Sequence, residues 1–356
     1  MKIFGQTDAA PKTLPRVKRN AVVQSQQSLV KTSFLAEGGT LPLVVEPNAD
    51  EVDVIEWAAG NRALVARHLL AHAGLLLRGF GVDSEEAFRR LLDALGLRLM
   101  RYAEGATPRT QLPGLVYTST EYPPDQRIAL HNELTYVTRW PGRILFCCAE
   151  PAESGGQTPI ADARRVLGRL SPALVGEFRR RGWMLVRNFG EGLSLPWRRS
   201  FHAETREEVE GYCRGARVEW EWVGEGGLRT RQVRPAVVRH PGTGEEVWFN
   251  HVAFWHESSL EAGVRAALRR VFAEEELPYN TYYGDGGRIP EEVVEEIREA
   301  YRAEAVEFVW ERGDVLVLDN MLAAHGRREF GGRRRVLAAM GDEVRVEEAA
   351  PEWRWQ

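Results

Sequence analysis

Short apolar runs rich in Val, Ile and Leu are spread between residues 41 and 340, and stretches with helical periodicity separate them. Their length and β-branched content are typical of buried strands. The predicted strands are residues 41–45, 75–80, 115–117, 128–130, 144–148, 306–310, 315–318 and 335–340. The predicted helices are residues 53–73, 84–97, 163–181, 206–214, 257–276 and 290–303. This pattern favours a domain with strands at its centre and long helical insertions.

No linker, repeat or low-complexity segment divides the chain, so residues 39–356 are predicted to form a single domain. Residues 1–38 are polar, poor in aromatic residues and without sustained periodicity. We expect them to form an arm that lies on the body of the protein or is poorly ordered. The sequence leaves the oligomeric state open.

Charge and cysteine content exclude several classes of partner and location. The 47 basic and 51 acidic residues nearly cancel to a net charge of −4, which argues against nucleic acid or an anionic membrane as a partner. No apolar stretch approaches the roughly 20 residues that a membrane span needs, and the first 20 residues lack the apolar region of a signal peptide. Three cysteines, two of them adjacent, cannot form a disulfide scaffold, so a cytoplasmic location is expected.

The triplet His131-Asn132-Glu133 directly follows the predicted strand 128–130. Alternate side chains of extended backbone point to the same face, so His131 and Glu133 converge while Asn132 points away. One imidazole and one carboxylate are two of the three ligands in the 2-His-1-carboxylate site of non-haem Fe(II). A His-x-Glu triplet is common by chance, and a surface polar pair is the alternative interpretation.

His325 supplies a second histidine, and it follows the predicted strand 315–318. Three arginines, Arg333, Arg334 and Arg335, then open the last predicted strand. The two histidines and the carboxylate would leave metal positions open for a 2-oxoacid and for O2. The far carboxylate of 2-oxoglutarate then needs a rigid bidentate cation, which a guanidinium supplies. A solvated basic turn is the alternative for the arginines.

Further blocks of sequence accompany these residues in a fixed order. They are residues 117–123 (YTSTEYP), 130–133 (LHNE), 155–162 (GGQTPIAD), 247–250 (VWFN), 282–286 (YYGDG), 310–314 (WERGD) and 319–327 (DNMLAAHGR). In this combination the chain resembles the TauD/TfdA family of Fe(II)/2-oxoglutarate-dependent dioxygenases over about residues 40–342. Within the family it is most similar to the SyrP-like branch, which is associated with nonribosomal peptide biosynthesis.

The resemblance implies a fold and a metal site. The fold is mixed α/β with an all-β core: a double-stranded β-helix, or jelly roll, with flanking helices and helical insertions. The implied iron ligands are His131, Glu133 and His325. The carboxylate is Glu where TauD has Asp, which matches the SyrP-like and clavaminate synthase-like branches. A small residue there would have opened a site for chloride, so Glu133 argues against halogenation.

The resemblance also implies how 2-oxoglutarate binds. Thr158 would form a hydrogen bond to the distal carboxylate, and an arginine of the run 333–335 would pair with it. Arg334 is the first choice, because Gly332 fixes the start of the family block, and Arg335 is the alternative. Strand alternation allows only one of these two arginines to face inward.

The activity implied is hydroxylation of an unactivated C–H bond, with O2 consumed and succinate and CO2 released. We expect a small amino-acid-like substrate, either free or bound to a carrier protein. The residues nominated for substrate binding are Thr135, Tyr136, Trp248 and Asn250. Two alternatives remain: a zinc hydrolase that uses the same His/Glu/His ligands, and a barrel without catalytic activity.

Overall fold

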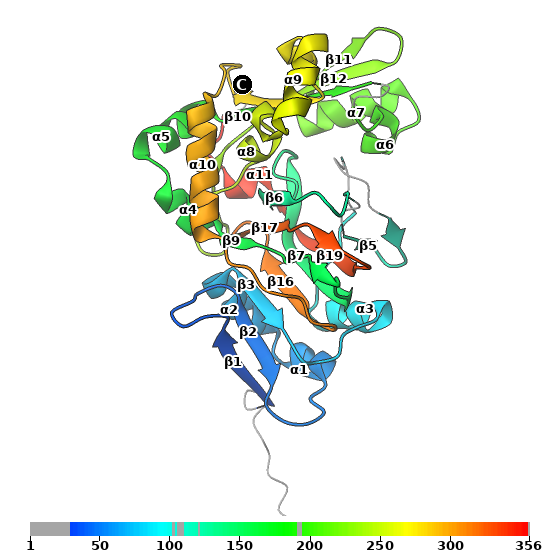
Figure 1. The fold of residues 1–356 in the computed structure, drawn as a ribbon, viewed down its shortest axis with the longest axis vertical. Helices are drawn as coiled ribbons and strands as arrows, with labels where there is room; N and C mark the ends of the chain where they lie inside the picture. The colour runs from blue at the N-terminus through cyan, green and yellow to red at the C-terminus, as the bar shows by residue number, and fades with distance from the viewer. Residues whose placement is uncertain (1–28, 102–103, 105–109, 120–121, 191–193, 355–356) are drawn as a thin grey trace, which may run out of the picture.

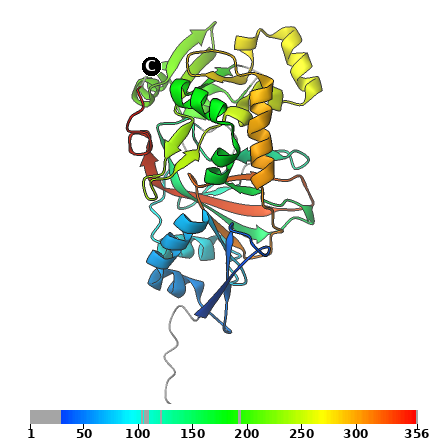
Figure 2. The same cartoon turned by 90° about the vertical axis from the view of Figure 1, so that its left-hand side faces the viewer.

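The computed structural model describes residues 29–101, 104, 110–119, 122–190 and 194–354. Figures 1 and 2 show strands through the middle of the molecule, with groups of helices at both ends and along one flank. The lower end in Figure 1 contains β1 (Val30–Phe34), β2 (Leu43–Pro47), α1 (Val54–Gly60), α2 (Arg62–His72), β3 (Gly74–Leu77) and α3 (Glu85–Ala94).

The middle of the molecule contains two sheets and one short strand pair. The strands in this region are β4 (Gln111–Leu112), β5 (Val116–Thr118), β6 (Ile128–His131), β7 (Arg139–Glu150), β8 (Ser154–Gly155), β9 (Ile160–Asp162), β16 (Val315–Asp319), β17 (Ala323–Arg327), β18 (Phe330–Gly331) and β19 (Arg335–Arg345). One flank holds α4 (Ala163–Arg169), α5 (Pro172–Arg181), β13 (Val237–Arg239), β14 (Glu246–Trp248) and α10 (Glu291–Glu304). The short pair β8 and β18 lies outside these two sheets.

The upper end in Figure 1 contains a separate four-stranded sheet with helices beside it. Its elements are β10 (Trp183–Phe189), α6 (Trp197–Phe201), α7 (Arg206–Ala216), β11 (Glu219–Val223), β12 (Gly227–Arg234), α8 (Val252–Trp255), α9 (Ala262–Val271) and β15 (Tyr279–Tyr283). The strand order is β11-β12-β10-β15. The last helix, α11 (Val346–Ala349), follows β19.

The larger central sheet has the order β1-β2-β3-β16-β7-β19-β5-β4, so it joins both ends of the chain. Strand β16 lies between β3 and β7 and is antiparallel to both, with Val317 opposite Leu75 and Leu145. Odd and even residues of these strands enter different cores. Val315 and Val317 pack toward α1–α3, whereas Leu316 and Leu318 pack toward α4 and α10. Helices therefore cover this sheet on both faces.

The smaller sheet has the order β6-β17-β9 and carries His131 and His325, two of the expected iron ligands. Strand β17 pairs with β6 on one side and with β9 on the other, both antiparallel. Its five residues are all buried. The sheet brings the middle of the chain against its C-terminal part.

Several predicted helix boundaries are confirmed and others are corrected. Ser84 caps α3 as predicted, since its hydroxyl accepts a hydrogen bond from the backbone N–H of Ala87. The helix predicted over residues 53–73 is interrupted at Asn61, whose side chain donates to the Trp57 carbonyl. The helix predicted over residues 163–181 is interrupted before Pro172, which begins α5. The helix predicted over residues 257–276 reduces to α9 with a short 3-10 turn at each end.

Two other predictions need correction. Residues 306–310 do not form a strand, and only Val306 makes an isolated bridge, to Ile160. The long insertions, which were predicted to be helical, also contain the sheet of β10, β11, β12 and β15. Val30–Phe34 of the predicted arm pair with β2 as an edge strand in which no residue is buried. Residues 1–28 of the arm lie outside the described residues. Within the described residues, no helix is long and apolar enough to cross a membrane.

Candidate metal centre

The pairing of β6 with β17 brings two histidines from distant parts of the chain together. His131 and His325 are directly opposite each other in this antiparallel pair, so their side chains lie on the same face. Their ring centroids are 4.6 Å apart. The pair was not predictable from spacing, because it depends on which strands meet.

A glycine allows the close approach of the two strands. The register shifts between His325 and Arg327, and Gly326 lies at this shift. A Cβ atom on Gly326 would lie 2.6 Å from the carbonyl oxygen of Ile128, which is too close for any other residue type. The His325-Gly326 sequence therefore serves the packing of β17 on β6.

Glu133 reaches the same point from the turn that follows β6. Asn320, in the loop before β17, holds the backbone of Glu133: its Oδ1 accepts from the Glu133 N–H at 2.7 Å, and its Nδ2 donates to the Glu133 carbonyl at 3.0 Å. Nδ2 also donates to the Pro141 carbonyl at 2.9 Å. Asn132 points away, as predicted, and its side chain donates to the Asn320 carbonyl at 2.7 Å. The two loops that carry the candidate ligands are thus tied together.

The three side chains offer ligand atoms that all lie within 4.8 Å of one another. His325 Nε2 is 4.0 Å from Glu133 Oε2, and both side chains are buried. His131 Nδ1 lies 2.9 Å from the Ala129 carbonyl, so Nδ1–H donates there and Nε2 is the nitrogen that would bind a metal. Two imidazole nitrogens and one carboxylate oxygen fit a non-haem Fe(II) ion.

A pocket adjoins this site and is lined by both histidines, Thr158, Arg334, Ser119 and Phe146. Trp310 Nε1–H donates to the Thr158 hydroxyl oxygen at 2.9 Å. Because the oxygen accepts this bond, the Thr158 hydroxyl hydrogen is left to donate to another acceptor. Trp310 was not singled out as a site residue; its place in the block 310–314 was the only sequence signal.

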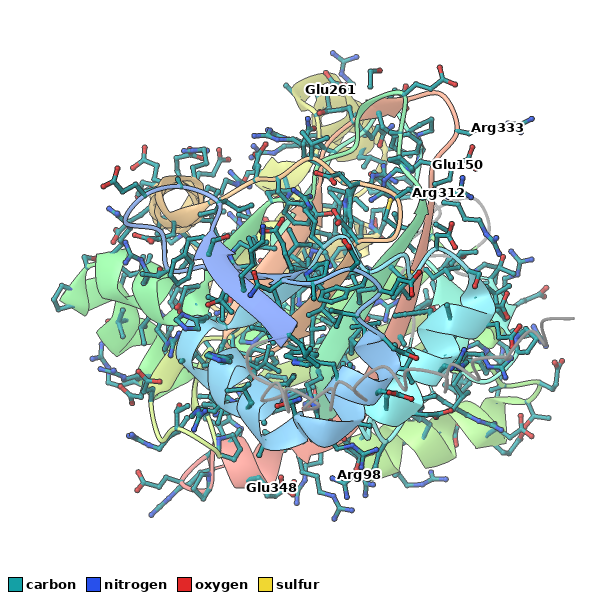
Figure 3. The ribbon with its side chains drawn as sticks, turned by 90° about the horizontal axis from the view of Figure 1, so that it is seen from below. Arg98, Glu150, Glu261, Arg312, Arg333 and Glu348 are labelled. Atoms are coloured by element: carbon teal, nitrogen blue, oxygen red, sulfur yellow. The ribbon has the colours of Figure 1, made fainter. Side chains whose placement is uncertain are left out.

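The arginine run resolves into three different environments. Arg334 lines the pocket, and its Nη1 lies 3.4 Å from the Ser119 hydroxyl. Arg335 is exposed and lies 3.8 Å from Glu85, so the alternative choice is placed outside the pocket. Arg333 extends from the surface, as Figure 3 shows. The strand alternation predicted for Arg334 and Arg335 agrees with this placement.

Arg334 is a half-buried cation that has no acidic partner within ion-pair distance in the described part of the chain. Burial, together with the nearby Arg327 charge, lowers the pKa of Arg334 to about 10. Its Nε atom is buried without a hydrogen-bond partner among the described residues. A guanidinium without an acidic partner suits a carboxylate ligand, so the lining of this pocket suits the distal carboxylate of 2-oxoglutarate.

Two of the four nominated substrate residues lie near the metal site. The Thr135 hydroxyl is 2.6 Å from Nδ1 of His251, and the Tyr136 ring is 5.4 Å from the His251 ring. His251 itself lies 5.6 Å from the His131 ring, yet sequence analysis did not single it out. Its position directly after the block 247–250 was the available signal. Burial, with the nearby His131, holds the pKa of His251 well below its usual range, so its imidazole is neutral.

The other two nominated residues serve the core. Trp248 is fully buried and packs edge-on against Phe178, with ring centroids 5.2 Å apart. The Asn250 side chain donates to the Ala236 carbonyl and accepts from the Val252 N–H, so both polar groups of its amide form hydrogen bonds to the backbone. Neither residue is among those that line the pocket.

Comparison with known proteins places this geometry in a family. The family described as "Taurine catabolism dioxygenase TauD, TfdA family" matches residues 38–340. Dapdiamide synthesis protein DdaC of Enterobacter agglomerans is 42% identical over 270 residues, which cover 76% of this chain and 82% of DdaC. A clavaminate synthase-like protein of Arabidopsis thaliana is 31% identical over 287 residues, with the same two coverages.

Solved structures show the same fold. PvcB of Pseudomonas aeruginosa superimposes with a TM-score of 0.54 at 19% identity, covering 93% of this chain and 96% of that chain. A second structure describes PvcB as an Fe, alpha-ketoglutarate dependent oxygenase from an isonitrile synthetic pathway. The likeness confirms the predicted double-stranded β-helix with flanking helices. With the family match over most of its length, the chain belongs to the TauD/TfdA family of Fe(II)- and 2-oxoglutarate-dependent dioxygenases.

Proposed function

We propose that this protein hydroxylates an unactivated C–H bond of an amino acid or a compound derived from one. One atom of O2 enters the new hydroxyl group, and the other enters succinate as 2-oxoglutarate loses CO2. The observation that carries the proposal is the meeting of His131, Glu133 and His325 beside a pocket that contains the unpaired Arg334. The similarity to DdaC, a dapdiamide synthesis protein, and to PvcB, an oxygenase from an isonitrile synthetic pathway, supports a small-molecule substrate.

The residues of this chain have separate tasks in the proposed reaction. His131, Glu133 and His325 hold the iron, which when bound supplies the oxidising chemistry. Arg334 and the Thr158 hydroxyl bind the distal carboxylate of 2-oxoglutarate. The protein fixes the position of the target carbon and excludes water, because a misplacement of about 1 Å can lower the rate on the order of a hundredfold. The free cysteines are buried, which agrees with the proposed cytoplasmic location.

The test of this function uses the metal-free full-length protein and measures succinate release. Fe(II) and 2-oxoglutarate together should be required for succinate formation in the presence of an amino-acid panel. Activity with Zn²⁺ alone would support the zinc hydrolase. No succinate and no visible charge-transfer band on anaerobic addition of Fe(II) and 2-oxoglutarate would support the inactive barrel.

Arg334→Gln is expected to raise the KM for 2-oxoglutarate by about a hundredfold or more. A buried charged hydrogen-bonded pair loses on the order of 2 to 5 kcal/mol when one partner is truncated. Succinate release at varied 2-oxoglutarate concentration measures the effect. Arg333→Gln is the matched control, since this neighbouring side chain extends into solvent, and its KM should equal that of the wild type. Equal KM values for both variants would refute the role of Arg334.

Trp310→Phe is expected to raise the KM for 2-oxoglutarate about fivefold with little change in kcat. The substitution keeps an aromatic ring but removes the N–H that fixes the Thr158 hydroxyl, and one neutral hydrogen bond contributes about 1 kcal/mol. Thr158→Val should raise the KM by at least as much. In the Thr158→Val background, Trp310→Phe should have no further effect on KM; an additive effect would contradict the orienting role.

A further inference from the structure

Arg187 on β10 is a buried arginine with unused hydrogen-bonding capacity. The residue is 7% exposed, and its Nη2 donates to the Ser200 hydroxyl at 3.2 Å. Its Nη1 is buried without a hydrogen-bond partner among the described residues. The guanidinium carries five N–H donors, and those on Nη1 are unfilled within the described residues. Arg334, which is half-buried, likewise has an unpartnered guanidinium nitrogen.

Arg234, on the neighbouring strand β12, shows what a structural arginine looks like in the same region. It is 1% exposed, and its guanidinium donates to four backbone carbonyls, those of Tyr136, Ala216, Arg217 and Val233. These bonds tie α7 to the segment after Glu133. The contrast indicates that Arg187 is not retained to hold backbone together.

The acidic neighbour of Arg187 compensates its charge only in part. Glu104 Oε1 lies 3.6 Å from Arg187 Nη1, which is too long for a hydrogen bond. The Glu104 carboxylate is instead held by the Tyr212 hydroxyl and the Gln232 side-chain N–H. Burial raises the pKa of Glu104, and the nearby Arg187 charge opposes that shift. A buried ion pair of poor geometry stabilises a fold little, so stability alone gives no reason for this one.

Two more polar atoms beside Arg187 lack partners. The Thr230 hydroxyl and the Gln232 side-chain carbonyl are fully buried and make no hydrogen bond within the described residues. Thr230 is directly opposite Arg187 in the pairing of β10 with β12, and Gln232 follows two residues later, so all three side chains share one face. Buried polar atoms are rarely left unpaired in native proteins, so such a cluster points to a polar ligand or water.

This face of the sheet is directed toward the metal centre. Tyr279 is opposite Arg187 on β15, and its ring lies 4.5 Å from that of Trp255 on α8. Phe254, the preceding residue of α8, lies 4.8 Å from the His131 ring. Helix α8 thus lies between the sheet and β6, as Figure 1 shows.

A second set of contacts connects the same two places. The Arg187 guanidinium carbon lies 5.9 Å from the Tyr136 ring, which packs against His251 beside His131. A chain of ring contacts therefore connects Arg187, through Tyr136 and His251, to His131. Arg334, in contrast, lines the pocket with Thr158.

We propose that Arg187, together with the Thr230 hydroxyl, binds a free carboxylate of the amino-acid substrate. This assignment rests on the proposed function, and it names the group by which the substrate is recognised. A guanidinium offers a carboxylate two parallel charge-assisted hydrogen bonds. The two arginines then hold two different carboxylates, that of the substrate at Arg187 and the distal one of 2-oxoglutarate at Arg334. A substrate in which every carboxyl group forms a thioester or an amide has no free carboxylate for Arg187 to bind.

The test is an anaerobic titration of the full-length protein loaded with Fe(II) and 2-oxoglutarate. The visible charge-transfer band first reports whether 2-oxoglutarate has bound, and a further shift of the band reports an amino acid bound beside the metal. The probes are the standard amino acids and their carboxamides, which differ in a single charged group. In the wild type, the amino acid that shifts the band should bind about ten to a hundred times more tightly than its carboxamide.

Arg187→Gln should keep the 2-oxoglutarate band and lose this discrimination, so that the acid binds as weakly as the amide. Arg187→Lys, which keeps the charge but not the bidentate geometry, should give an intermediate affinity. The matched control is Arg231→Gln on β12, because Arg231 faces the other side of the sheet and pairs with Glu221; it should behave as the wild type.

Each result decides one question. Absence of the 2-oxoglutarate band in the wild type would refute the proposed function itself. A normal band with no shift by any amino acid, with equal binding of acid and amide, or with unchanged affinity in Arg187→Gln would refute the role of Arg187 while leaving the dioxygenase function in place.

Discussion

Glu133→Gln should abolish Fe(II)-dependent turnover, with a loss of at least about a thousandfold. Substitution of residues that only support metal ligands typically costs ten- to a hundredfold in metal affinity or activity, and removal of a ligand should cost more. The amide has the size of the carboxylate but carries no negative charge for the metal. Glu133 is buried, so the isosteric amide removes a buried charge without opening a cavity, and the metal-free fold should tolerate the change.

The measurement separates metal binding from folding. Without metal, the free energy of unfolding of the variant should lie within about 1 kcal/mol of that of the wild type. Saturating metal at about 100 times Kd should stabilise the wild type by about 2.7 kcal/mol and leave Glu133→Gln unchanged. Glu150→Gln is the matched control, since Glu150 is exposed at the end of β7 (Figure 3). Metal-dependent stabilisation and turnover retained in Glu133→Gln would show that the carboxylate is not a ligand.

The convergence of His131 and Glu133 could be predicted from the sequence because it follows from local backbone geometry. His131 and Glu133 are two residues apart at the end of a strand, and backbone geometry alone directs them to one side. Their meeting with His325 depends on the pairing of β6 with β17, which no local pattern encodes. Sequence reached His325 through the resemblance to a family. The choice between Arg334 and Arg335 likewise depended on the exact start of β19.

The interruptions of the two long predicted helices were visible in the sequence. Asn61 follows Gly60, and Pro172 follows Ser171, which are ordinary signals for the end of one helix and the start of the next. Residues 306–310 have strand composition but form a β-bridge only at Val306, because tertiary packing overrides β-propensity.

The upper sheet was missed although part of its pattern was present. Glu219–Val223 reads Glu-Trp-Glu-Trp-Val, which alternates with the period of a strand, and the structure alternates its exposure accordingly. Arg187 was harder to find, because a strand residue that is charged and buried looks like a solvated residue in sequence. Its role becomes visible only when its partners are known.

Asn320→Ala should weaken metal binding about ten- to a hundredfold while the protein still folds. Asn320 joins the two loops that carry the candidate ligands, through three hydrogen bonds to the backbone of Glu133 and Pro141. Losing them should destabilise the fold by about 3 kcal/mol, at about 1 kcal/mol for each bond. The separate effect on metal affinity should arise because Glu133 is no longer held opposite His325.

A second variant and a control separate positioning from stability. Asn320→Asp keeps an acceptor for the Glu133 N–H but loses both donors, so its metal affinity should lie at or below that of Asn320→Ala. Asn280 is a buried asparagine of β15 that accepts from the backbone N–H groups of Glu257 and Thr281 and donates to the Tyr282 hydroxyl. Asn280→Ala should therefore lose similar stability and keep wild-type metal affinity. Co(II) titration of each folded variant measures the affinity, and equal values for Asn320→Ala and Asn280→Ala would mean that the link through Asn320 does not set the ligand geometry.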